Sequence, residues 1–446
     1  KHKIDFFQNS KSPECDILKV SDRRCNDVKS RHTGIIYYTI YMASIIYVAR
    51  DIERALGKEP VGNYFIITNE TSYARVIQEK YPDNVWLIKS PEILDTYELL
   101  TLPEVQKTIS EHNETQILVF KNTPHIEALC KEKGWRLLNP SAALCEKVES
   151  KISQVEWLGE LSSLLPPHKI CTVNEISWNK KAFIIQWNHG HTGEGTLLVQ
   201  NEADLNTLKA KFPHREGRVT DFINGPMFTA NIVVTDTPIL LGNISYQITG
   251  VLPFTDVVFS TVGNDWSVTH SILDEKHIQK FEKIAELIAQ KMQKDGWRGL
   301  FGIDVIYDEE RDEMYLIEIN ARQPASTTFE SELQSATRSM GVPGITTFEA
   351  HLSALQHIAP TSVLVPINDG AQIIQRLTRA VMIKNEKDFE DLFHIQKLLA
   401  AGYKTIMYKN IKPNDDLLRI QSSQGIMLAH NKFNKRGKEI TEIITE

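Results

Sequence analysis

The most informative stretch of this 446-residue chain is FGIDVIYDEERDEMYLIEINARQPAS, residues 301–326. Two mostly apolar runs, 299–308 and 313–322, lie on either side of the charged turn EERD. Short runs rich in β-branched and aromatic residues around a short polar turn are typical of a β-hairpin. Because the residues flanking the turn are so strongly apolar, we predict that this hairpin belongs to a buried sheet.

Three polar side chains interrupt the apolar hairpin. Asp304 lies in its first strand, and Glu318 and Asn320 lie in its second. Side chains alternate along a strand, so Glu318 and Asn320 should share one face while Ile317 and Ile319 point to the other. Asp304 can then lie beside Glu318 across the pair. Two carboxylates and one amide oxygen form a hard oxygen site that suits Mg²⁺. A solvated polar face is the alternative, although carboxylates in a core would need a compensating charge.

The first part of the chain alternates between strand and helix patterns. The apolar runs NYFIIT (63–68) and TQILVF (115–120) are each followed by helical spacing, and the second helix should stop at Gly134. This alternation predicts an open α/β domain with a parallel sheet. We expect this domain to occupy residues 1–140.

An uncharged run, IIYYTIYMASIIYVA at 35–49, raises the question of a membrane span. It is shorter than the ~20 apolar residues that a span requires. A charged stretch follows from Arg50. We therefore predict a largely buried helix that ends near Gly57, and no membrane partner. The N-terminal KHKIDFFQNS lacks the apolar core of a signal peptide.

The composition excludes some classes of partner. Net charge is −7, and acidic and basic residues are mixed along the chain without a long basic block, so we expect no nucleic-acid partner. Five cysteines are widely scattered and form no CxxC pair, which indicates reduced thiols and a cytoplasmic protein. These cysteines are Cys15, Cys25, Cys130, Cys145 and Cys171.

The pattern changes from about residue 145. A charged helix, 145–161, is expected to end before Pro166. Short connections between the strands that follow favour antiparallel pairing. A long helix is expected at 275–294, and the tail from 345 reads as mixed α/β with a helix in DFEDLFHIQKLLAAG, 388–402. The predicted strands are KICTV, KAFIIQW, GTLLVQ, GRVTDFI, FTANIVV and PILLGNISYQ.

A glycine-rich segment, HGHTGEGT, separates two of these strands within AFIIQWNHGHTGEGTLLV. Gly190, Gly193 and Gly195 allow sharp backbone turns that bring N–H groups to an anion. Thr192 and Thr196 could add hydroxyl donors. A plain hairpin loop is the alternative interpretation.

Taken together, the pattern Gly-Ile-Asp followed by Glu-Ile-Asn-x-Arg resembles the metal-binding segment of the ATP-grasp superfamily. The resemblance covers about 145–330. It implies that Asp304, Glu318 and Asn320 hold Mg²⁺, or Mn²⁺ as a substitute, against the phosphates of ATP. It also implies that Arg322 contacts the transferred phosphate or the substrate carboxylate and is catalytic.

The resemblance implies further contacts to the nucleotide. The family usually has a lysine where this chain has Gln186, so either Gln186 is a neutral substitute or Lys180 or Lys181 reaches in. Met227 stands near the position where many relatives have a ribose-binding Glu, so Asp221 could supply polar contacts instead. Lys147 and Lys151 lie on one face of the predicted helix, and Lys151 fits the family pattern better. The implied nucleotide-binding residues are Lys151, Gln186, Gly190, His191, Thr192, Gly193, Gly195, Thr196, Thr220, Asp221, Phe222 and Ile223.

The resemblance also implies the order of domains. The fold class is α/β and α+β, with the N-terminal open α/β (pre-ATP-grasp) domain followed by a two-lobed ATP-grasp core at 141–335. Within the core, we expect a small glycine-loop lobe at about 165–220 and a metal-hairpin lobe at about 221–335. A C-terminal α/β segment, 336–446, is expected to be a substrate or lid region.

By resemblance the chain is an ATP-dependent carboxylate–amine ligase of the peptide-forming type. Such an enzyme activates a carboxylate as an acyl phosphate and couples it to an amine, releasing ADP and phosphate. The expected partners are small-molecule carboxylates and amines such as amino acids or peptides, and a homodimer is left open. Two alternatives remain: a biotin-carboxylase-like enzyme and a nucleotide-binding regulatory protein without catalysis.

Overall fold

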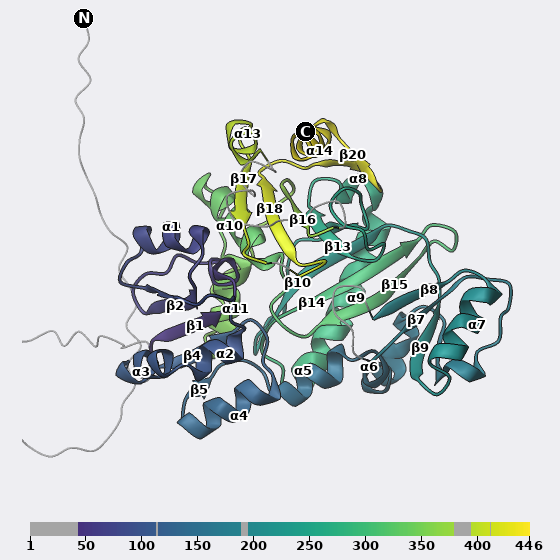
Figure 1. Cartoon of the computed structure of the whole chain (residues 1–446), viewed down its shortest axis with the longest axis horizontal. Helices are drawn as coiled ribbons and strands as arrows, with labels where there is room; N and C mark the ends of the chain where they lie inside the picture. The colour runs from purple at the N-terminus through teal and green to yellow at the C-terminus, as the bar shows by residue number, and fades with distance from the viewer. Residues whose placement is uncertain (1–42, 113–114, 189–194, 379–393, 411) are drawn as a thin grey trace, which may run out of the picture. The chain divides into compact units, whose positions relative to one another are not determined.

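The computed structural model describes residues 43–112, 115–188, 195–378, 394–410 and 412–446. Figure 1 shows these residues in colour and the remainder in grey. The described residues include three sheets of four or more strands. None of their helices combines the length and the apolar character that a membrane crossing requires.

The first sheet is parallel, with strand order β3-β2-β1-β4-β5. The predicted alternation of strands and helices is confirmed here (Figure 1). Its elements are β1 (Ile45–Ala49), η1 (Ile52–Ala55), β2 (Tyr64–Asn69), α1 (Ser72–Lys80), β3 (Val85–Ile88), α2 (Thr96–Thr101), α3 (Pro103–Glu111), β4 (Gln116–Val119), α4 (Pro124–Lys133) and β5 (Arg136–Leu137).

The helix predicted from the run at 35–49 to near Gly57 is wrong over residues 45–49, which form β1, and only the short 3-10 helix η1 follows. This strand pairs with β2 on one side and β4 on the other, and each of its residues is buried. A central parallel strand is covered on both faces, so its sequence is a continuous apolar run without alternation. Periodicity alone cannot separate such a run from a buried helix. Residues 35–42 lie outside the described ranges.

Helix α4 shows how local sequence sets the ends of an element. The Thr123 side chain accepts a hydrogen bond from the Ile126 N–H, and Pro124 occupies the first turn, where its missing N–H costs nothing. Gly134 ends the helix with φ of 71°, in the left-handed region that glycine adopts without strain. The predicted stop at Gly134 is confirmed.

The second sheet is antiparallel, with order β6-β9-β7-β8. The predicted helix at 145–161 is wrong as a single element, because Ser150 is extended and separates two shorter helices. The elements of this region are α5 (Ala142–Glu149), α6 (Lys151–Leu158), η2 (Gly159–Leu164), β6 (His168–Thr172), η3 (Val173–Glu175), β7 (Phe183–Gln186), β8 (Thr196–Val199), α7 (Glu202–Lys211) and β9 (Glu216–Asp221).

The third sheet has the order β15-β14-β10-β12-β13-β16-β18-β17, and β11 pairs with β10. The predicted hairpin is β14 and β15, at one edge, while the C-terminal β16 and β18 continue the same sheet (Figure 1). Its strands are β10 (Met227–Val234), β11 (Leu240–Leu241), β12 (Ser245–Thr249), β13 (Thr261–Asp265), β14 (Gly299–Asp308), β15 (Glu313–Asn320), β16 (Ala371–Arg376), β17 (Lys404–Met407) and β18 (Asp416–Ser422).

Helices accompany this sheet, and the helix predicted at 275–294 is confirmed as α9 (Glu275–Lys294). Of the helix predicted at 388–402, the described part is α13 (Ile395–Ala400), and residues 388–393 lie outside the described ranges. The remaining elements are α8 (Thr269–Ile272), α10 (Thr327–Ser339), α11 (Thr347–Leu355), α14 (Lys435–Thr445) and the strand pair β19 (Met427–Ala429) and β20 (Lys432–Phe433).

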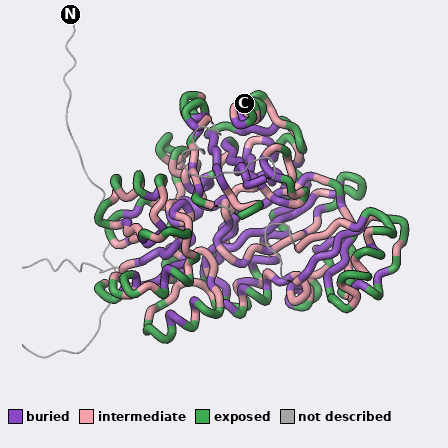
Figure 2. Tube along the Cα trace, viewed as in Figure 1, coloured by how far each residue is buried: buried purple, intermediate pink, exposed green. Residues whose placement is uncertain are grey.

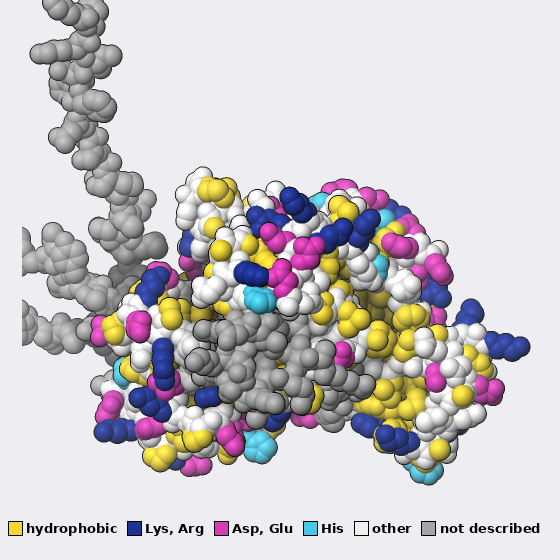
Figure 3. Space-filling view, turned by 45° about the horizontal axis from the view of Figure 1, so that its top comes forward, with side chains coloured by type: hydrophobic (Ala, Val, Ile, Leu, Met, Phe, Trp, Pro, Cys, Tyr) yellow, Lys and Arg dark blue, Asp and Glu magenta, His cyan; other side chains and the backbone are white. Residues whose placement is uncertain are grey.

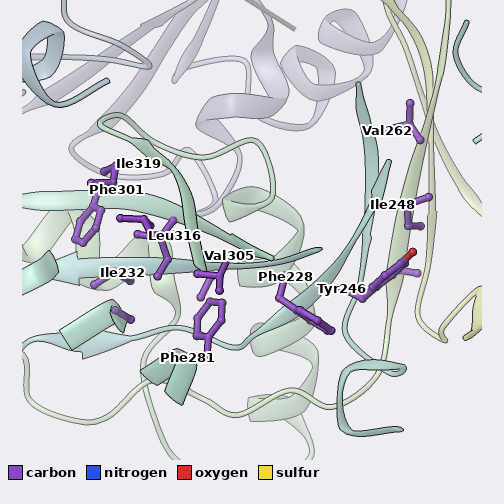
Figure 4. Close-up of a cluster of buried hydrophobic side chains, with 14 of the residues drawn as sticks. Phe228, Ile232, Tyr246, Ile248, Val262, Phe281, Phe301, Val305, Leu316 and Ile319 are labelled. Atoms are coloured by element: carbon purple, nitrogen blue, oxygen red, sulfur yellow. The ribbon is translucent and has the colours of Figure 1, made fainter. Parts of the chain in front are cut away.

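The largest core cluster lies between α9 and the third sheet. In Figure 4, Phe281 of α9 points toward Val305 of β14, with Leu316 of β15 nearby. Figure 2 shows that the strands are mostly buried and the outer turns of the helices exposed. Burial of this apolar face is the main favourable term that holds α9 against the sheet.

The surface of the described residues carries charges of both signs. Figure 3 shows Lys and Arg side chains interspersed with Asp and Glu side chains on the face in view. This agrees with the mixed charge pattern of the sequence. The described cysteines, Cys130, Cys145 and Cys171, are unpaired, as expected for reduced thiols.

Replacing Phe281 by Ala should lower the free energy of unfolding by about 3–5 kcal/mol, because it removes a buried ring and leaves a cavity. Urea unfolding followed by tryptophan fluorescence would measure the loss. Val76→Ala is the matched control, since Val76 is 61% exposed. Equal effects of the two substitutions would contradict the assignment of Phe281 to the core.

Candidate functional site

A cavity of about 600 Å³ brings the sequence-predicted residues together. Its wall includes residues of the second and third sheets, of the loop that follows β4, and of the segment between α5 and α6. The residues that matter below are Lys121, Glu149, Lys151, Ile184, Gln186, Gly195, Thr196, Arg218, Thr220, Asp221, Phe222, Ile223, Met227, Thr229, Gln247, Asn264, Asp304, Ile306, Ile317, Glu318, Asn320, Arg322, Gln372 and Arg419.

The three predicted metal ligands lie side by side at one end of the β14–β15 hairpin. Asp304 is directly opposite Glu318 in the register, and Asn320 is opposite Gly302. The Asn320 side-chain amide donates a hydrogen bond to the Asp304 carboxylate, with 3.3 Å between Nδ2 and Oδ2. All three side chains face the cavity, so the hairpin presents two carboxylates and one amide to it.

The predicted alternation fails at one position of the second strand. The register between β14 and β15 shifts after Asp304, because Val305 pairs with Leu316 and leaves Ile317 as an extra residue. Such a bulge sends two consecutive side chains toward the same face. Ile317 therefore lines the cavity beside Glu318, whereas Ile319 is buried in the core.

Asp304 is a buried acid with neutral hydrogen-bond donors. The residue is 7% exposed, and its carboxylate is hydrogen-bonded by Thr229, Gln247 and Asn320. Burial and the neighbouring Glu318 charge raise the pKa of Asp304 to about 6, and the three hydrogen bonds lower it in part. A divalent cation would stabilise the ionised form of this carboxylate, and its oxygen donors are those that Mg²⁺ prefers. The residues present thus fit the implied metal.

Glu318 has a cationic partner. The Lys151 ammonium lies 2.8 Å from Glu318 Oε1, and the Lys151 side chain is only 12% exposed. Burial alone would raise the pKa of Glu318, but Lys151, with Arg322 and Arg218 adding smaller contributions, holds that pKa below its usual value. Glu318 therefore ionises at lower pH than Asp304.

The break between α5 and α6 places Lys151 at the cavity. The Ile152 N–H donates to Asn188 Oδ1 at 3.0 Å, which satisfies one free donor at the start of α6. The Gln154 amide donates to the Val148 carbonyl at 2.8 Å, which satisfies an acceptor at the end of α5. The prediction that Lys147 and Lys151 share one helical face is therefore wrong, and Lys147 is exposed on α5.

Gln186 ends β7 inside the cavity and is bound to a buried arginine on the next strand. Arg218 of β9 donates to Gln186 Oε1 from both Nε and Nη2, at 3.0 and 2.8 Å. The two residues face each other in the register of the sheet. Lys180 and Lys181 are exposed and do not line the cavity, so the suggestion that either reaches in is wrong.

Arg322 lies at the other side of the acid pair. Its Nη2 donates to Asn320 Oδ1 at 2.9 Å, and its Nε is 3.5 Å from Glu149 Oε1. Glu149 also forms a salt bridge with Lys121, which follows β4 of the first sheet. The guanidinium of Arg322 stacks over the Phe120 ring at 5.4 Å. Arg322 is thus held at the cavity wall by a carboxylate, an amide and an aromatic face.

The implied nucleotide-binding segment 220–223 also lines the cavity. Thr220 and Ile223 are buried, Phe222 is half-buried, and Asp221 is exposed. The Asp221 carboxylate forms a salt bridge with Arg311 at 3.2 Å and so already has a partner.

Three apolar residues of the cavity lining, Ile184, Met227 and Ile306, are called the apolar slot below. Met227 and Ile306 face each other across β10 and β14.

Part of the predicted glycine loop lies outside the described residues, namely Gly190, His191, Thr192 and Gly193. The two ends of the loop are described. Gln186 pairs with Thr196 in the β7–β8 hairpin, and the Trp187 N–H donates to the Gly195 carbonyl at 2.9 Å. Gly195 and Thr196 line the cavity, so the loop begins and ends at its edge.

Sequence reasoning missed Arg218, Glu149 and the neutral donors of Asp304. Thr229 and Gln247 come from β10 and β12, and only the folded sheet brings them to Asp304. For Arg218 a signal was present: it is a charged residue inside the otherwise buried strand GRVTD.

The sequence of residues 148–326 matches the profile of the ATP-grasp domain. Comparison with curated proteins gave no significant match. Among solved structures, the chain is similar to N5-carboxyaminoimidazole synthetase from Staphylococcus aureus, at 11% identity and a TM-score of 0.60, with 90% of this chain and 97% of that chain covered. It is also similar to carboxyaminoimidazole ribonucleotide synthase from Aspergillus clavatus complexed with ATP, at 13% identity and a TM-score of 0.61, with 90% and 98% covered.

A third similar structure is the biotin carboxylase domain of the Hydrogenobacter thermophilus 2-oxoglutarate carboxylase. Its identity is 12% and its TM-score 0.57, with 86% of this chain and 87% of that chain covered. At these identities the likeness shows the fold, and the predicted fold class is confirmed. ATP-grasp domains are the nucleotide-binding core of ATP-dependent, ligase-type enzymes. Residues 148–326 therefore form an ATP-grasp domain.

Proposed function

We propose that this chain is a ligase that uses ATP and Mg²⁺ to activate a small-molecule carboxylate and couple it to an amine. The observation that carries the proposal is the pair Asp304 and Glu318, opposite each other on one hairpin and beside Lys151 in a cavity with an apolar slot. The pair would hold Mg²⁺ together with Asn320. Bound there, the ion would offset charge on the transferred phosphoryl group.

The balanced reaction has two steps. In the first, a carboxylate oxygen of the substrate attacks the γ-phosphorus of ATP, the bond to the β-phosphate oxygen breaks, and ADP leaves. In the second, the amine nitrogen attacks the carbonyl carbon of the acyl phosphate. The carbon–oxygen bond to phosphate then breaks, phosphate leaves, and the nitrogen loses a proton to give the amide.

The chain's own residues would position the reactants. The Lys151 ammonium would bind a phosphate oxygen and neutralise charge at the Glu318 side of the site. The Arg322 guanidinium presents a planar set of donors suited to the carboxylate or the transferred phosphate. Its contacts to Glu149, Asn320 and Phe120 restrict its motion, so these donors are already oriented when the substrate enters.

Beyond the acids, the cavity wall is polar and suits a small polar substrate. Gln372 of β16 donates to Asn264 of β13 at 3.2 Å, and Arg419 of β18 donates to Gln372 at 3.0 Å. These residues line the cavity with Arg322, and they belong to strands that continue the sheet of the metal hairpin. We propose that the side of the cavity formed by Asn264, Gln372 and Arg419 binds the carboxylate and the amine. Both substrates would come from the class of amino acids and peptides.

The proposed domains keep the boundaries expected from the sequence: 1–140, 141–335 and 336–446. Lys121, in the first domain, and Arg419, in the third domain, both line the cavity that the core residues line. Each flanking domain would therefore contribute side chains to substrate binding. Cytoplasmic location and a homodimer remain predictions from the sequence.

The second candidate function uses bicarbonate as the carboxylate. The biotin carboxylase domain with a similar fold was crystallised with MgADP and bicarbonate. The similar synthetases are named for carboxyaminoimidazole products. Carboxylation of an amine would employ the same acid pair and the same activated phosphate, so the site geometry is compatible with it.

A substrate screen separates the two candidates. We expect release of ADP from ATP and Mg²⁺ to rise when pairs of amino acids are added, because both halves of the reaction are then present. Coupled-enzyme detection of ADP would measure it. Stimulation by bicarbonate and an amine alone, with no response to any added organic carboxylate, would contradict the ligase proposal in favour of carboxylation.

Glu318→Ala should abolish ATP turnover while the protein remains folded. The substitution removes one proposed metal ligand and leaves Lys151 without its carboxylate partner. Circular dichroism would verify the fold, and ADP release would measure turnover. Glu310→Ala, in the exposed turn of the same hairpin, is the matched control. Unchanged turnover in Glu318→Ala would exclude this metal site. If the wild type itself shows no ATP turnover, a non-catalytic regulatory protein is favoured instead.

Mg²⁺ affinity should increase as pH rises through about 6, because the metal requires the ionised form of Asp304. The folded pKa is raised above the unfolded value of about 3.9. The stability that Asp304 contributes without metal is therefore greatest below about pH 4 and is lost as pH rises to about 6.

Thermal unfolding with increasing Mg²⁺, at about pH 5 and about pH 7.5, would measure the difference in metal affinity. Asp304→Asn should bind Mg²⁺ weakly at both values. If Mg²⁺ raises the unfolding temperature of the wild type equally at both pH values, the role of Asp304 as a metal ligand is contradicted.

A further inference from the structure

Arg218 is a fully buried cation that borders the cavity. Its side chain is 1% exposed, and it donates hydrogen bonds to Gln186 Oε1, to Gln154 Oε1 at 2.9 Å and to the Ile317 carbonyl at 3.1 Å. Each of these acceptors is neutral. Burying a charge is costly unless an opposite charge compensates it.

Glu318 is the acid whose charge acts on Arg218, but its carboxylate is already engaged by Lys151 at 2.8 Å. Burial lowers the pKa of Arg218 to about 10, and the Glu318 charge raises it in part, so the guanidinium is still a cation at neutral pH. Among the described residues, Glu318 is thus shared between two cations, and Arg218 has no carboxylate within salt-bridge distance of its own. A phosphate close to Arg218 would supply an opposite charge that its neutral acceptors do not.

Gln186 is the group through which this charge would meet a ligand. Two N–H groups of Arg218 converge on Gln186 Oε1, at 3.0 and 2.8 Å. That contact fixes the orientation of the amide, because the oxygen must face Arg218 and the Nε2 group must then turn away from it. Gln186 lines the cavity and pairs with Thr196 at the edge of the glycine loop. Its N–H groups are thus positioned as donors toward the cavity.

We propose that Arg218 and Gln186 form one phosphate-binding unit for a nucleoside di- or triphosphate. Gln186 contacts a phosphate oxygen through its amide, and Arg218 orients that amide and provides the positive charge behind it. The unit rests on the proposed function, because it assumes that the apolar slot of Ile184, Met227 and Ile306 receives the base. The slot and the unit lie in the same cavity, so the phosphates can extend toward Lys151 and the acid pair.

The unit also explains how a phosphate can be bound although the side chain at position 186 is uncharged. The positive charge is on Arg218 of the neighbouring strand β9, and the register of the sheet pairs Arg218 with Gln186 at the end of β7. An arginine suits the buried position because its planar guanidinium can hold several acceptors at once, which an ammonium cannot do with the same geometry.

Binding of ADP and of adenosine to the full chain, with Mg²⁺ present, tests the unit without knowledge of the substrates. Isothermal titration calorimetry should show that Arg218→Gln weakens ADP binding by about 10- to 100-fold, the effect of losing a charge-assisted contact. Adenosine has no phosphates, so its affinity should not change. Lys147→Gln removes an exposed charge of the same sign and should leave both affinities unchanged.

Two further variants separate the charge from the packing. Arg218→Gln combined with Gln186→Lys should recover most of the lost ADP affinity, because it returns a cation to the same wall. Gln186→Glu keeps Arg218 and its partner oxygen but places a carboxylate where the phosphate would bind. It should weaken ADP binding at least as much as Arg218→Gln does. If Arg218→Gln does not fold, Gln186→Glu alone tests whether the unit binds a phosphate.

Each outcome supports or overturns the unit. Selective loss of ADP affinity with unchanged adenosine affinity supports it. ADP affinity that is unchanged in Gln186→Glu, or that falls in parallel with adenosine affinity in every variant, overturns the unit while leaving the proposed function in place. A wild-type protein that binds neither nucleotide overturns the proposed function and the unit with it.

Discussion

The guanidinium of Arg218 joins three elements whose positions define the cavity. Its bonds to Gln186 and Gln154 link β9 to β7 and to α6, and its bond to the Ile317 carbonyl holds the bulge of β15. Gln154 in turn closes the break between α5 and α6 through the Val148 carbonyl. The break turns Lys151 inward, and the bulge turns Glu318 inward. One buried side chain thus connects the features that create the Lys151–Glu318 salt bridge.

The acid pair illustrates how environment separates two chemically similar groups. Asp304 and Glu318 are neighbours on adjacent strands, yet burial raises the pKa of one while a lysine lowers that of the other. The difference follows from which partners the fold provides: neutral donors for Asp304 and an ammonium for Glu318. Without metal, the Lys151 ammonium offsets the charge of Glu318, and the hydrogen bonds from Thr229, Gln247 and Asn320 partly stabilise the ionised form of Asp304.

The sequence was sufficient wherever local rules govern the structure. Helix α9 was predicted with both ends correct because its apolar residues recur at helical spacing and Asp274 caps its start. The hairpin and its acids were predicted because strand alternation and a polar turn are short-range signals. Roles of individual residues in binding and catalysis came from family resemblance, and for them the structure provides the geometry on which the proposals rest.

Failures occurred where distant contacts override local pattern. The run at 45–49 became a central strand because two neighbouring strands cover it, and Ser150 interrupts a helical sequence because Asn188 and Gln154 satisfy the broken ends. The carbonyl of the bulged Ile317 accepts a hydrogen bond from Arg218, which lies 99 positions away in the chain. No window of sequence around these residues contains the atoms that decide their conformation.

The C-terminal strands have a consequence for how the protein forms. Strands β16 and β18 extend the sheet of β14 and β15, and Gln372 and Arg419 complete the cavity wall. A ribosome must therefore release the chain past Ser422 before that wall can close, although the acid pair was made about one hundred residues earlier. Pairings between such remote segments are slow to form, so the completed nucleotide cavity should be among the last features to appear during synthesis.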